Sequence, residues 1–111
     1  MEIVKGQVVL CRFYFTDLKM SKNRPELVFK DNLPYDDFIA MPISSKVEKL
    51  HKDEELIGDD DFEEGGLPVL SKLMIRKTFV VSKKSIVKSY GLVNKTPLKK
   101  YHKNFCHYFS C

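Results

Sequence analysis

The sequence predicts one small, mainly β domain that ends in an α-helix. Residues 7–15 alternate between two faces and are rich in β-branched and aromatic side chains, which is typical of a half-buried strand. Further strand-like runs follow at short intervals, separated by polar segments that contain Pro or Gly. After residue 95 the pattern changes to a helical repeat. A length of 111 residues is that of a single domain, and we take residues 1–111 as one unit.

In the first predicted strand, alternate side chains point to the same face of the sheet. The face expected to meet the core carries Val9, Cys11, Phe13 and Phe15. Residues 26–30 and 38–43 predict the second and third strands. The polar segment before the second strand ends at Pro25 and is predicted to be a loop. Pro42 cannot donate a ladder hydrogen bond, so it should mark a strand end or an edge.

The middle of the chain is strongly acidic. Eight carboxylates and no basic residue lie between Asp53 and Glu64. Because like charges repel, most of this run is expected to be an exposed loop, although Leu56-Ile57 has the composition of a short strand. The alternative, a cation site, lacks the spacing of a calcium-binding loop.

Strand patterns return in the second half of the chain. Residues 73–81 predict one strand and residues 86–92 another, with Gly91 at a bulge or a close backbone approach. A helix over residues 83–90, capped by Ser82, is the alternative for the latter segment. Thr96-Pro97 then predicts a helix start, as an N-cap hydroxyl followed by Pro. Its apolar stripe should pack on the core rather than stack on bases, and contains Leu98, Tyr101, Phe105 and Tyr108.

Charge is divided unevenly along the chain. Residues 1–65 carry nine basic and fifteen acidic side chains, whereas residues 66–111 carry ten basic side chains and no acidic one. A segment with a net charge of +10 favours a polyanionic partner, such as RNA, DNA or an acidic protein segment. The alternative is a basic surface that is merely solvated.

The three cysteines, Cys11, Cys106 and Cys111, argue against a disulfide framework because their number is odd, and they favour a reducing compartment. His and Cys residues near the C-terminus match no standard zinc spacing, so neither a metal site nor a cofactor motif is predicted. No apolar run approaches the ~20 residues needed to span a bilayer, and the N-terminal residues lack a signal-peptide pattern. We therefore expect a cytoplasmic protein that does not engage a membrane.

Candidate chemistry gathers in the first 45 residues, at strand ends and in the polar segment between strands. Hydroxyl groups beside an Arg are suited to phosphate, because a guanidinium offers planar, paired donors to an oxyanion. The alternatives are an Arg24–Asp17 ion pair and hydroxyls that cap backbone groups. The residues concerned are Thr16, Asp17, Ser21, Lys22, Arg24, Ser44 and Ser45.

A set of short elements runs in order from about Gly6 to Leu92. These are G-Q-V-V-L at 6–10, F-T-D at 15–17, S-K-N-R-P-E-L-V at 21–28, P-I-S-S at 42–45, G-L-P at 66–68, the strand-like segment 72–81 and S-I-V-K at 85–88. In this order and approximate spacing, the set resembles the MazF/PemK family of toxin ribonucleases from bacterial toxin–antitoxin modules. The ordered set carries the resemblance, because no single element is specific.

The resemblance implies an SH3-like antiparallel β barrel of the CcdB/MazF/PemK type with a C-terminal helix. It implies a type II toxin: a metal-independent, sequence-selective endoribonuclease that cleaves single-stranded RNA through 2′-OH attack. Such a toxin would be a homodimer that a cognate antitoxin protein inhibits. The implied catalytic pair is Arg24 and Ser44, with Ser44 in place of the usual Thr. The implied RNA-binding residues are Thr16, Asp17, Ser21, Lys22 and Ser45.

Two other functions stay open. A toxin resembling CcdB would bind DNA gyrase without cleaving RNA and would not depend on Arg24. A family member that has lost catalysis would only bind nucleic acid, and Ser44 and the basic, aromatic tail keep this alternative open. Base specificity should depend on loops such as residues 17–23 and 46–65.

Overall fold

The computed structural model describes residues 2–14 and 19–111. It confirms a mainly β fold, since strands account for 47% of the structure. In the described part of the chain, eight strands pair antiparallel in the order β4-β6-β3-β2-β1-β8-β5, with β7 beside β3. The elements are β1 (Gln7–Tyr14), β2 (Ser21–Lys30), β3 (Asp37–Ser44), β4 (Glu54–Ile57), β5 (Phe62–Gly65), β6 (Ser71–Met74), β7 (Phe79–Ser82), β8 (Ile86–Val93) and α1 (Lys95–Phe109).

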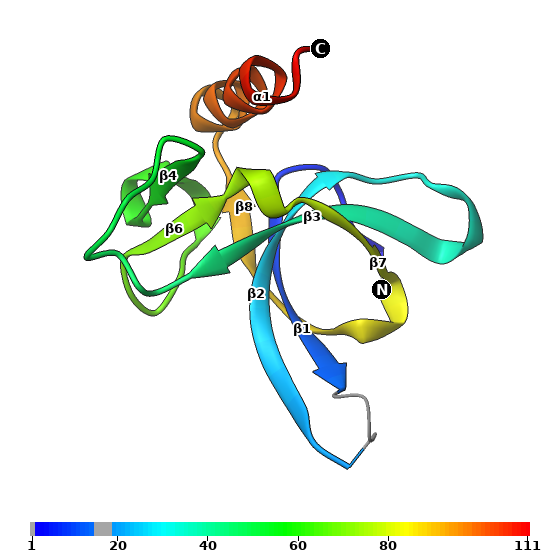
Figure 1. Ribbon diagram of the computed structural model, residues 1–111. Helices are drawn as coiled ribbons and strands as arrows, with labels where there is room; N and C mark the ends of the chain where they lie inside the picture. The colour runs from blue at the N-terminus through cyan, green and yellow to red at the C-terminus, as the bar shows by residue number, and fades with distance from the viewer. Residues whose placement is uncertain (1, 15–18) are drawn as a thin grey trace.

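The sheet curls into a half-barrel, with β7 coming round beside β3 and helix α1 lying outside the curl (Figure 1). Apolar clusters occupy both faces of this sheet, because neighbouring residues in a strand point to opposite sides. One cluster contains Val8 and Leu27 and is covered by Tyr101 of α1. The other, on the face that we call the concave face, contains Val9 and Val28. Both clusters hold fully buried side chains, so the strands are apolar on two sides.

The prediction of a loop in the polar segment that ends at Pro25 is wrong. Strand β2 already begins at Ser21, which pairs with Tyr14, and Arg24 pairs with Cys11. The ladder with β1 holds these polar residues in extended backbone, and their side chains are exposed at the end of a long hairpin. Pro25 lies inside β2, just before the ladder between β2 and β3 begins, so its missing N–H costs that ladder nothing.

Strand β3 changes partners along its length. Its first part pairs with β7 and β2, and its last two residues pair with β6. The single strand predicted over residues 73–81 is therefore wrong, because a 3-10 turn at Ile75–Lys77 divides it into β6 and β7. The Thr78 hydroxyl closes this turn by donating to the Ile75 carbonyl at 2.7 Å. Pro42 pairs with Glu26 of β2 and, along the opposite edge of β3, lies between the residues that pair with β7 and those that pair with β6, which suits a residue without an N–H.

The acidic segment is not the exposed loop that was predicted. It forms β4, a 3-10 turn at Asp59–Asp61 and β5, and the predicted strand character of Leu56-Ile57 is confirmed. Tertiary contacts compensate the charge: the Glu54 carboxylate accepts a hydrogen bond from Lys72 Nζ at 2.9 Å in a largely buried ion pair. These contacts come from residues distant in sequence, which a local charge pattern does not reveal.

The segment after β7 is a short turn and then a strand, so the helix alternative is wrong. The Ser82 hydroxyl accepts from the Lys84 N–H at 3.2 Å and caps a three-residue 3-10 turn, after which β8 begins. The close approach predicted at Gly91 is confirmed, because a Cβ atom there would overlap the Glu64 carbonyl of β5.

Helix α1 begins earlier than predicted, with Asn94 rather than Thr96 at the N-cap. The Leu98 N–H donates to the Asn94 carbonyl at 3.2 Å. The apolar stripe packs on the core as predicted through Tyr101, which is 1% exposed, but Tyr108 at its end is 45% exposed. Within the described residues, no helix is both long enough and apolar enough to cross a bilayer.

The C-terminus contains a disulfide bond, between Cys106 and Cys111, that the odd cysteine count did not predict. Ser110 adopts a left-handed conformation with φ of 59°, which ends the helix and turns the chain back. The Cys111 N–H then donates to the Cys106 carbonyl at 3.0 Å, so the two side chains meet over the last turn. The bond is a local closure of the helix end rather than a framework.

Candidate functional site

A cavity of about 300 Å³ opens on the concave face, beside the β1–β2 hairpin. Six strand positions converge on it from β1, β2, β3 and β7. Its aromatic walls are Phe13 and Phe79, whose ring centroids are 5.9 Å apart. The complete lining is Phe13, Lys22, Arg24, Glu26, Pro42 and Phe79. The cavity thus combines an apolar wall with two cations and one carboxyl group.

Arg24 and Lys22 supply the positive charge of this cavity. Alternate residues of β2 share a face, so both side chains lie on the concave side, and both are exposed. Within residues 2–14 and 19–111, the Arg24 guanidinium has no salt-bridge partner. The predicted alternative, a pair with Asp17, lies outside the described residues. A guanidinium in this setting can offer paired donors to a phosphate oxygen.

Glu26 is the buried polar residue of the cavity. Its side chain is 1% exposed, and Oε2 has no hydrogen-bond partner in the part of the chain that the structure describes. Its cross-strand neighbours are Val9 on β1 and Pro42 on β3, of which the first is apolar and the second has no N–H. Burial raises the pKa of the Glu26 carboxyl to about 8, although the charge of Arg24 lowers it in part. The carboxyl is therefore mostly protonated at neutral pH.

Ser44 lies on β3, on the same face as Pro42, because the two are separated by one residue. The β2–β3 ladder ends at the Glu26–Pro42 pair, and the same register carried two residues further leads to Arg24 on one strand and Ser44 on the other. Ser44 is not part of the cavity lining: its hydroxyl accepts from the Lys46 N–H at 3.2 Å, and its backbone pairs with Lys72.

The other predicted site residues are distributed around this cavity. Ser21 is exposed near the tip of the hairpin, one residue before Lys22, and Ser45 is exposed just after β3 ends. Thr16 and Asp17 lie outside the described residues. The structure therefore brings Lys22 and Arg24 together in one cavity, and places Ser44 on the neighbouring strand.

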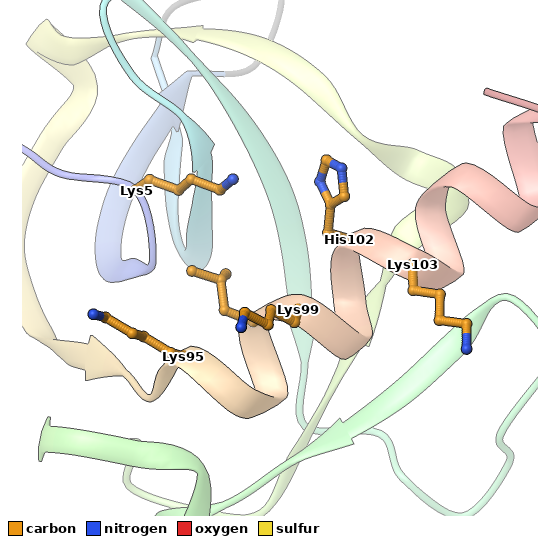
Figure 2. A pocket seen from close by; sticks show the side chains of 6 residues that line it. Lys5, Lys95, Lys99, His102 and Lys103 are labelled. Atoms are coloured by element: carbon orange, nitrogen blue, oxygen red, sulfur yellow. The ribbon is translucent and has the colours of Figure 1, made fainter.

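A second cavity, of about 340 Å³, lies beside the first half of α1 (Figure 2). Its lining is Lys5, Lys95, Leu98, Lys99, His102 and Lys103. Figure 2 shows the labelled side chains coming from the helix and from the segment before β1. The floor is aliphatic and the polar groups are ammonium or imidazole, so this surface attracts anionic segments. It is larger than the concave cavity, but it contains no carboxyl or hydroxyl that could take part in proton transfer.

The Cys and His residues of α1 do not assemble a metal centre in the described residues, where no group of three or more potential ligands is close enough to hold an ion. Cys106 is bonded to Cys111, and its sulfur lies 3.8 Å from His102 Nε2. The His102 ring stacks on Phe29, with centroids 5.4 Å apart.

Sequence reasoning identified the cations of the concave cavity but not the residues that shape it. Glu26, Phe13, Phe79 and Pro42 come from four strands, and only the curl of the sheet brings them together. One signal was present: Glu26 is the first residue of the strand predicted over residues 26–30 and shares a face with the apolar Val28. A carboxyl on a core-facing position is unusual enough to mark a site.

Comparison with known protein families identifies one that matches this chain. Residues 4–109 match the model of the PemK-like, MazF-like toxin of type II toxin-antitoxin system. Because the match includes nearly the whole chain, the protein belongs to this family, as the sequence motifs implied. No curated protein sequence is a significant match.

Solved structures share the fold at low sequence identity. An endoribonuclease in complex with its cognate antitoxin from a mycobacterial species has a TM-score of 0.73 and 16% identity, over 98% of this chain and 96% of that one. Mycobacterium tuberculosis toxin MazF-mt6 has a TM-score of 0.71 and 16% identity, over 94% and 96%. A MazE–MazF complex from Deinococcus radiodurans has a TM-score of 0.74 and 14% identity, over 96% and 94%. At these identities the likeness establishes the fold.

Proposed function

We propose that this protein is a toxin of a type II toxin–antitoxin system that acts as a metal-independent, sequence-selective endoribonuclease on single-stranded RNA. The observation that carries the proposal is the concave cavity, where the exposed Arg24 guanidinium lies beside Lys22 and a pair of aromatic rings. Cations bind the phosphate backbone, and aromatic faces stack on unpaired bases. Family membership and the titles of the similar structures support the same activity.

The reaction in this proposal uses the 2′-OH of the RNA as the nucleophile. The 2′-oxygen forms a bond to phosphorus and loses its proton, while the bond from phosphorus to the 5′-oxygen breaks and that oxygen gains a proton. The products are a 2′,3′-cyclic phosphate and a 5′-hydroxyl end. Negative charge develops on the non-bridging oxygens, so fixed donors there lower the barrier.

Arg24 is the residue that would stabilise this charge. Its guanidinium stays protonated, which suits charge stabilisation and delivery of a hydrogen bond to the leaving oxygen, but not proton abstraction. Ser44, on the adjacent strand and the same face, would donate from its hydroxyl to a non-bridging oxygen. The Ser44 hydroxyl already accepts a hydrogen bond from the Lys46 N–H. It can keep this bond while it donates to the substrate, or it can release the bond when the substrate binds.

The proposed partners are a second copy of the chain and an antitoxin. One of the similar structures is titled as an endoribonuclease in complex with its cognate antitoxin, and another as MazE-MazF. An acidic antitoxin segment would bind the basic C-terminal half, where Lys95, Lys99 and Lys103 surround the aliphatic floor of the second cavity (Figure 2). A flexible acidic segment would order on this surface as it binds.

The test is cleavage of a long RNA of mixed sequence in EDTA by the wild type, Arg24→Ala and Ser44→Ala. Arg12→Ala is the matched control, because it removes the same charge from the neighbouring strand on the opposite face. We expect discrete fragments from the wild type and the control, and a loss of rate on the order of 100-fold or more in Arg24→Ala. A smaller loss is expected in Ser44→Ala, since it removes one neutral donor.

The outcome also separates the alternative functions. Intact RNA with folded wild-type protein would overturn the nuclease assignment in favour of a gyrase-binding or binding-only toxin. RNA retention in a mobility shift would then indicate a binding-only protein. Cleavage that continues in Arg24→Ala would leave the nuclease but remove Arg24 from its site.

A further inference from the structure

We propose that the concave cavity holds one nucleobase of the RNA, and that the Glu26 carboxyl at its floor hydrogen-bonds the edge of that base. The inference rests on the proposed function, because it assumes that RNA is the ligand. In this proposal Glu26 determines base specificity, whereas the neighbouring Arg24 binds the phosphate.

The unpartnered carboxyl is the first observation. A buried polar atom without a hydrogen bond costs free energy, and such groups are uncommon in folded proteins. Glu26 Oε2 is in this state in the described structure, and its neighbours across the two ladders, Val9 and Pro42, have no side-chain donor to offer. Glu26 nevertheless belongs to the lining of a cavity on the concave face, so a ligand that enters can complete its hydrogen bonding once the carboxyl turns toward it.

The shape and chemistry of the cavity are the second observation. Its volume of about 300 Å³ accommodates a planar heterocycle, and the rings of Phe13 and Phe79 offer faces for stacking. Lys22 and Arg24 flank the same cavity and can contact the phosphates attached to that nucleotide. The rings and the cations could also receive an aromatic and an acidic side chain of a peptide, but a nucleotide also offers a heterocyclic edge that can hydrogen-bond the Glu26 carboxyl, so the arrangement favours a nucleotide over an antitoxin segment.

The protonation state of Glu26 decides which base edges it can bind. The charged groups that face it are Arg24 and Lys22 of β2, and the Cys11 thiol of β1 is the other titratable neighbour; Pro42 of β3 and Phe79 of β7 carry no charge. At neutral pH the carboxylic acid presents one O–H donor and one carbonyl acceptor. It therefore pairs with an edge that has an acceptor next to a donor. Each base has such an edge, but the order of the two groups in adenine and cytosine is the reverse of that in guanine and uracil, so a carboxyl held in one orientation discriminates between these two classes. Once ionised it has two acceptors, and pairs with the adjacent N1–H and N2–H donors of guanine.

The first experiment measures binding without cleavage. Fluorescently labelled 2′-O-methyl oligonucleotides of A, C, G and U cannot undergo 2′-OH attack, so their affinities are compared at pH 7 by anisotropy. We expect the wild type to prefer one base, and Glu26→Met to lose at least about tenfold of that preference, as expected for a paired hydrogen bond to a base. Glu26→Gln should keep it, because an amide also offers one donor and one acceptor. Glu63→Met, an exposed substitution on β5, is the control for the lost carboxyl.

The second experiment uses pH and needs no apolar variant, in case Glu26→Met does not fold. Between pH 7 and pH 9 the wild type should shift its preference toward guanine, whereas Glu26→Gln should not shift. The same comparison on a randomised RNA, with the product ends sequenced, should place the change at one nucleotide next to the cleavage site.

Several results would overturn the inference. These are equal affinity of the wild type for all four oligonucleotides, an unchanged preference in folded Glu26→Met, or the same pH response in Glu26→Gln as in the wild type. Failure of the proposed function gives a different result, namely no cleavage of ordinary RNA by wild-type protein. The binding experiments decide the role of Glu26 in that case as well.

Discussion

Arg24 and Glu26 lie two residues apart on the same face of β2, yet the guanidinium is exposed and the carboxyl is buried with one oxygen unpaired. The two groups do not form a salt bridge within the described structure. Burial of Glu26 therefore outweighs the attraction of Arg24, and the pKa of the carboxyl is raised to about 8. The neutral acid leaves the charge of Arg24 available for an anion.

The raised pKa of Glu26 predicts a pH-dependent stability. In the unfolded chain the carboxyl ionises near its ordinary pKa of 4.5, whereas in the folded chain it keeps its proton until about pH 8. The folded state binds more protons between these values, so the contribution of Glu26 makes the free energy of unfolding fall as pH rises through this window. The free energy of unfolding of Glu26→Gln, relative to that of the wild type, should therefore increase by on the order of 4 kcal/mol between pH 5 and pH 8.5.

Urea unfolding of both proteins at pH 5, 7 and 8.5 measures this difference. Equal slopes of stability against pH in the two proteins would show that Glu26 ionises normally in the folded state.

The Lys72–Glu54 pair predicts a large loss of stability on removal of its cation. Lys72 Nζ donates to Glu54 Oε1 and to the Lys49 carbonyl, both at 2.9 Å, and both charged side chains are under 10% exposed. Lys72→Met should cost roughly 3 kcal/mol at pH 7, because it leaves a buried carboxylate without its partner. Lys100→Met, which breaks an exposed pair with Glu55, should cost less than about 1 kcal/mol.

The cost of Lys72→Met should also depend on pH. Burial works against ionisation of Glu54, but hydrogen bonds from the His51 N–H and from Lys72 hold the pKa of its carboxyl below the ordinary value. A carboxyl with a lowered pKa stabilises the fold above its unfolded pKa, and this contribution is lost as pH falls through its folded pKa. The difference between Lys72→Met and wild type, measured by chemical denaturation, should shrink below pH 4.5. A cost that is constant down to pH 3 would contradict the ion pair.

The backbone at Gly65 predicts that any side chain at this position destabilises the fold. Its φ is +69°, and a Cβ atom would overlap the Tyr90 carbonyl of β8, which is held in the sheet. Gly65→Ala should therefore destabilise the protein by on the order of 3 kcal/mol. In the control Gly58→Ala, the new methyl group meets only the end of the exposed Leu70 side chain, at 3.1 Å, so the loss should stay below about 1 kcal/mol. Similar melting temperatures for the two variants would refute the assigned geometry.

The burial of Cys11 predicts that its thiol is unreactive. Its side chain is fully buried, and burial raises its pKa to about 11, with a smaller increase from Glu26 and a decrease from a hydrogen bond to Ser85. The thiolate is the reactive form, so labelling with a disulfide reagent at pH 8 should be at least about 100-fold slower than for a free cysteine. With Cys106 and Cys111 bonded, labelling in denaturant should then give one thiol per chain. Rapid labelling of the native protein would show that Cys11 is accessible.

Local patterns predicted most of the elements and part of the site. Alternation identified β1, strand-like composition identified β3 and β8, helical spacing identified α1, and the ordered motifs led to the family and to Arg24 and Lys22. These patterns predicted only the cations of the site. Glu26, Phe13 and Phe79 could not be assigned to one cavity, because the register between strands and the curl of the sheet are not encoded in any single segment.

The sequence by itself therefore determined the type of most elements, since strand and helix periodicities and the Pro and Gly signals act within a few residues. Tertiary structure decided the rest. The segment from Ser21 is a strand because β1 pairs with it, and residues 73–81 are broken because two parts of β3 need different partners. Glu26 is buried because the curled sheet encloses it between Val9 and Pro42. In each case the deciding hydrogen bonds and contacts come from residues distant in the chain, where local propensity carries no information.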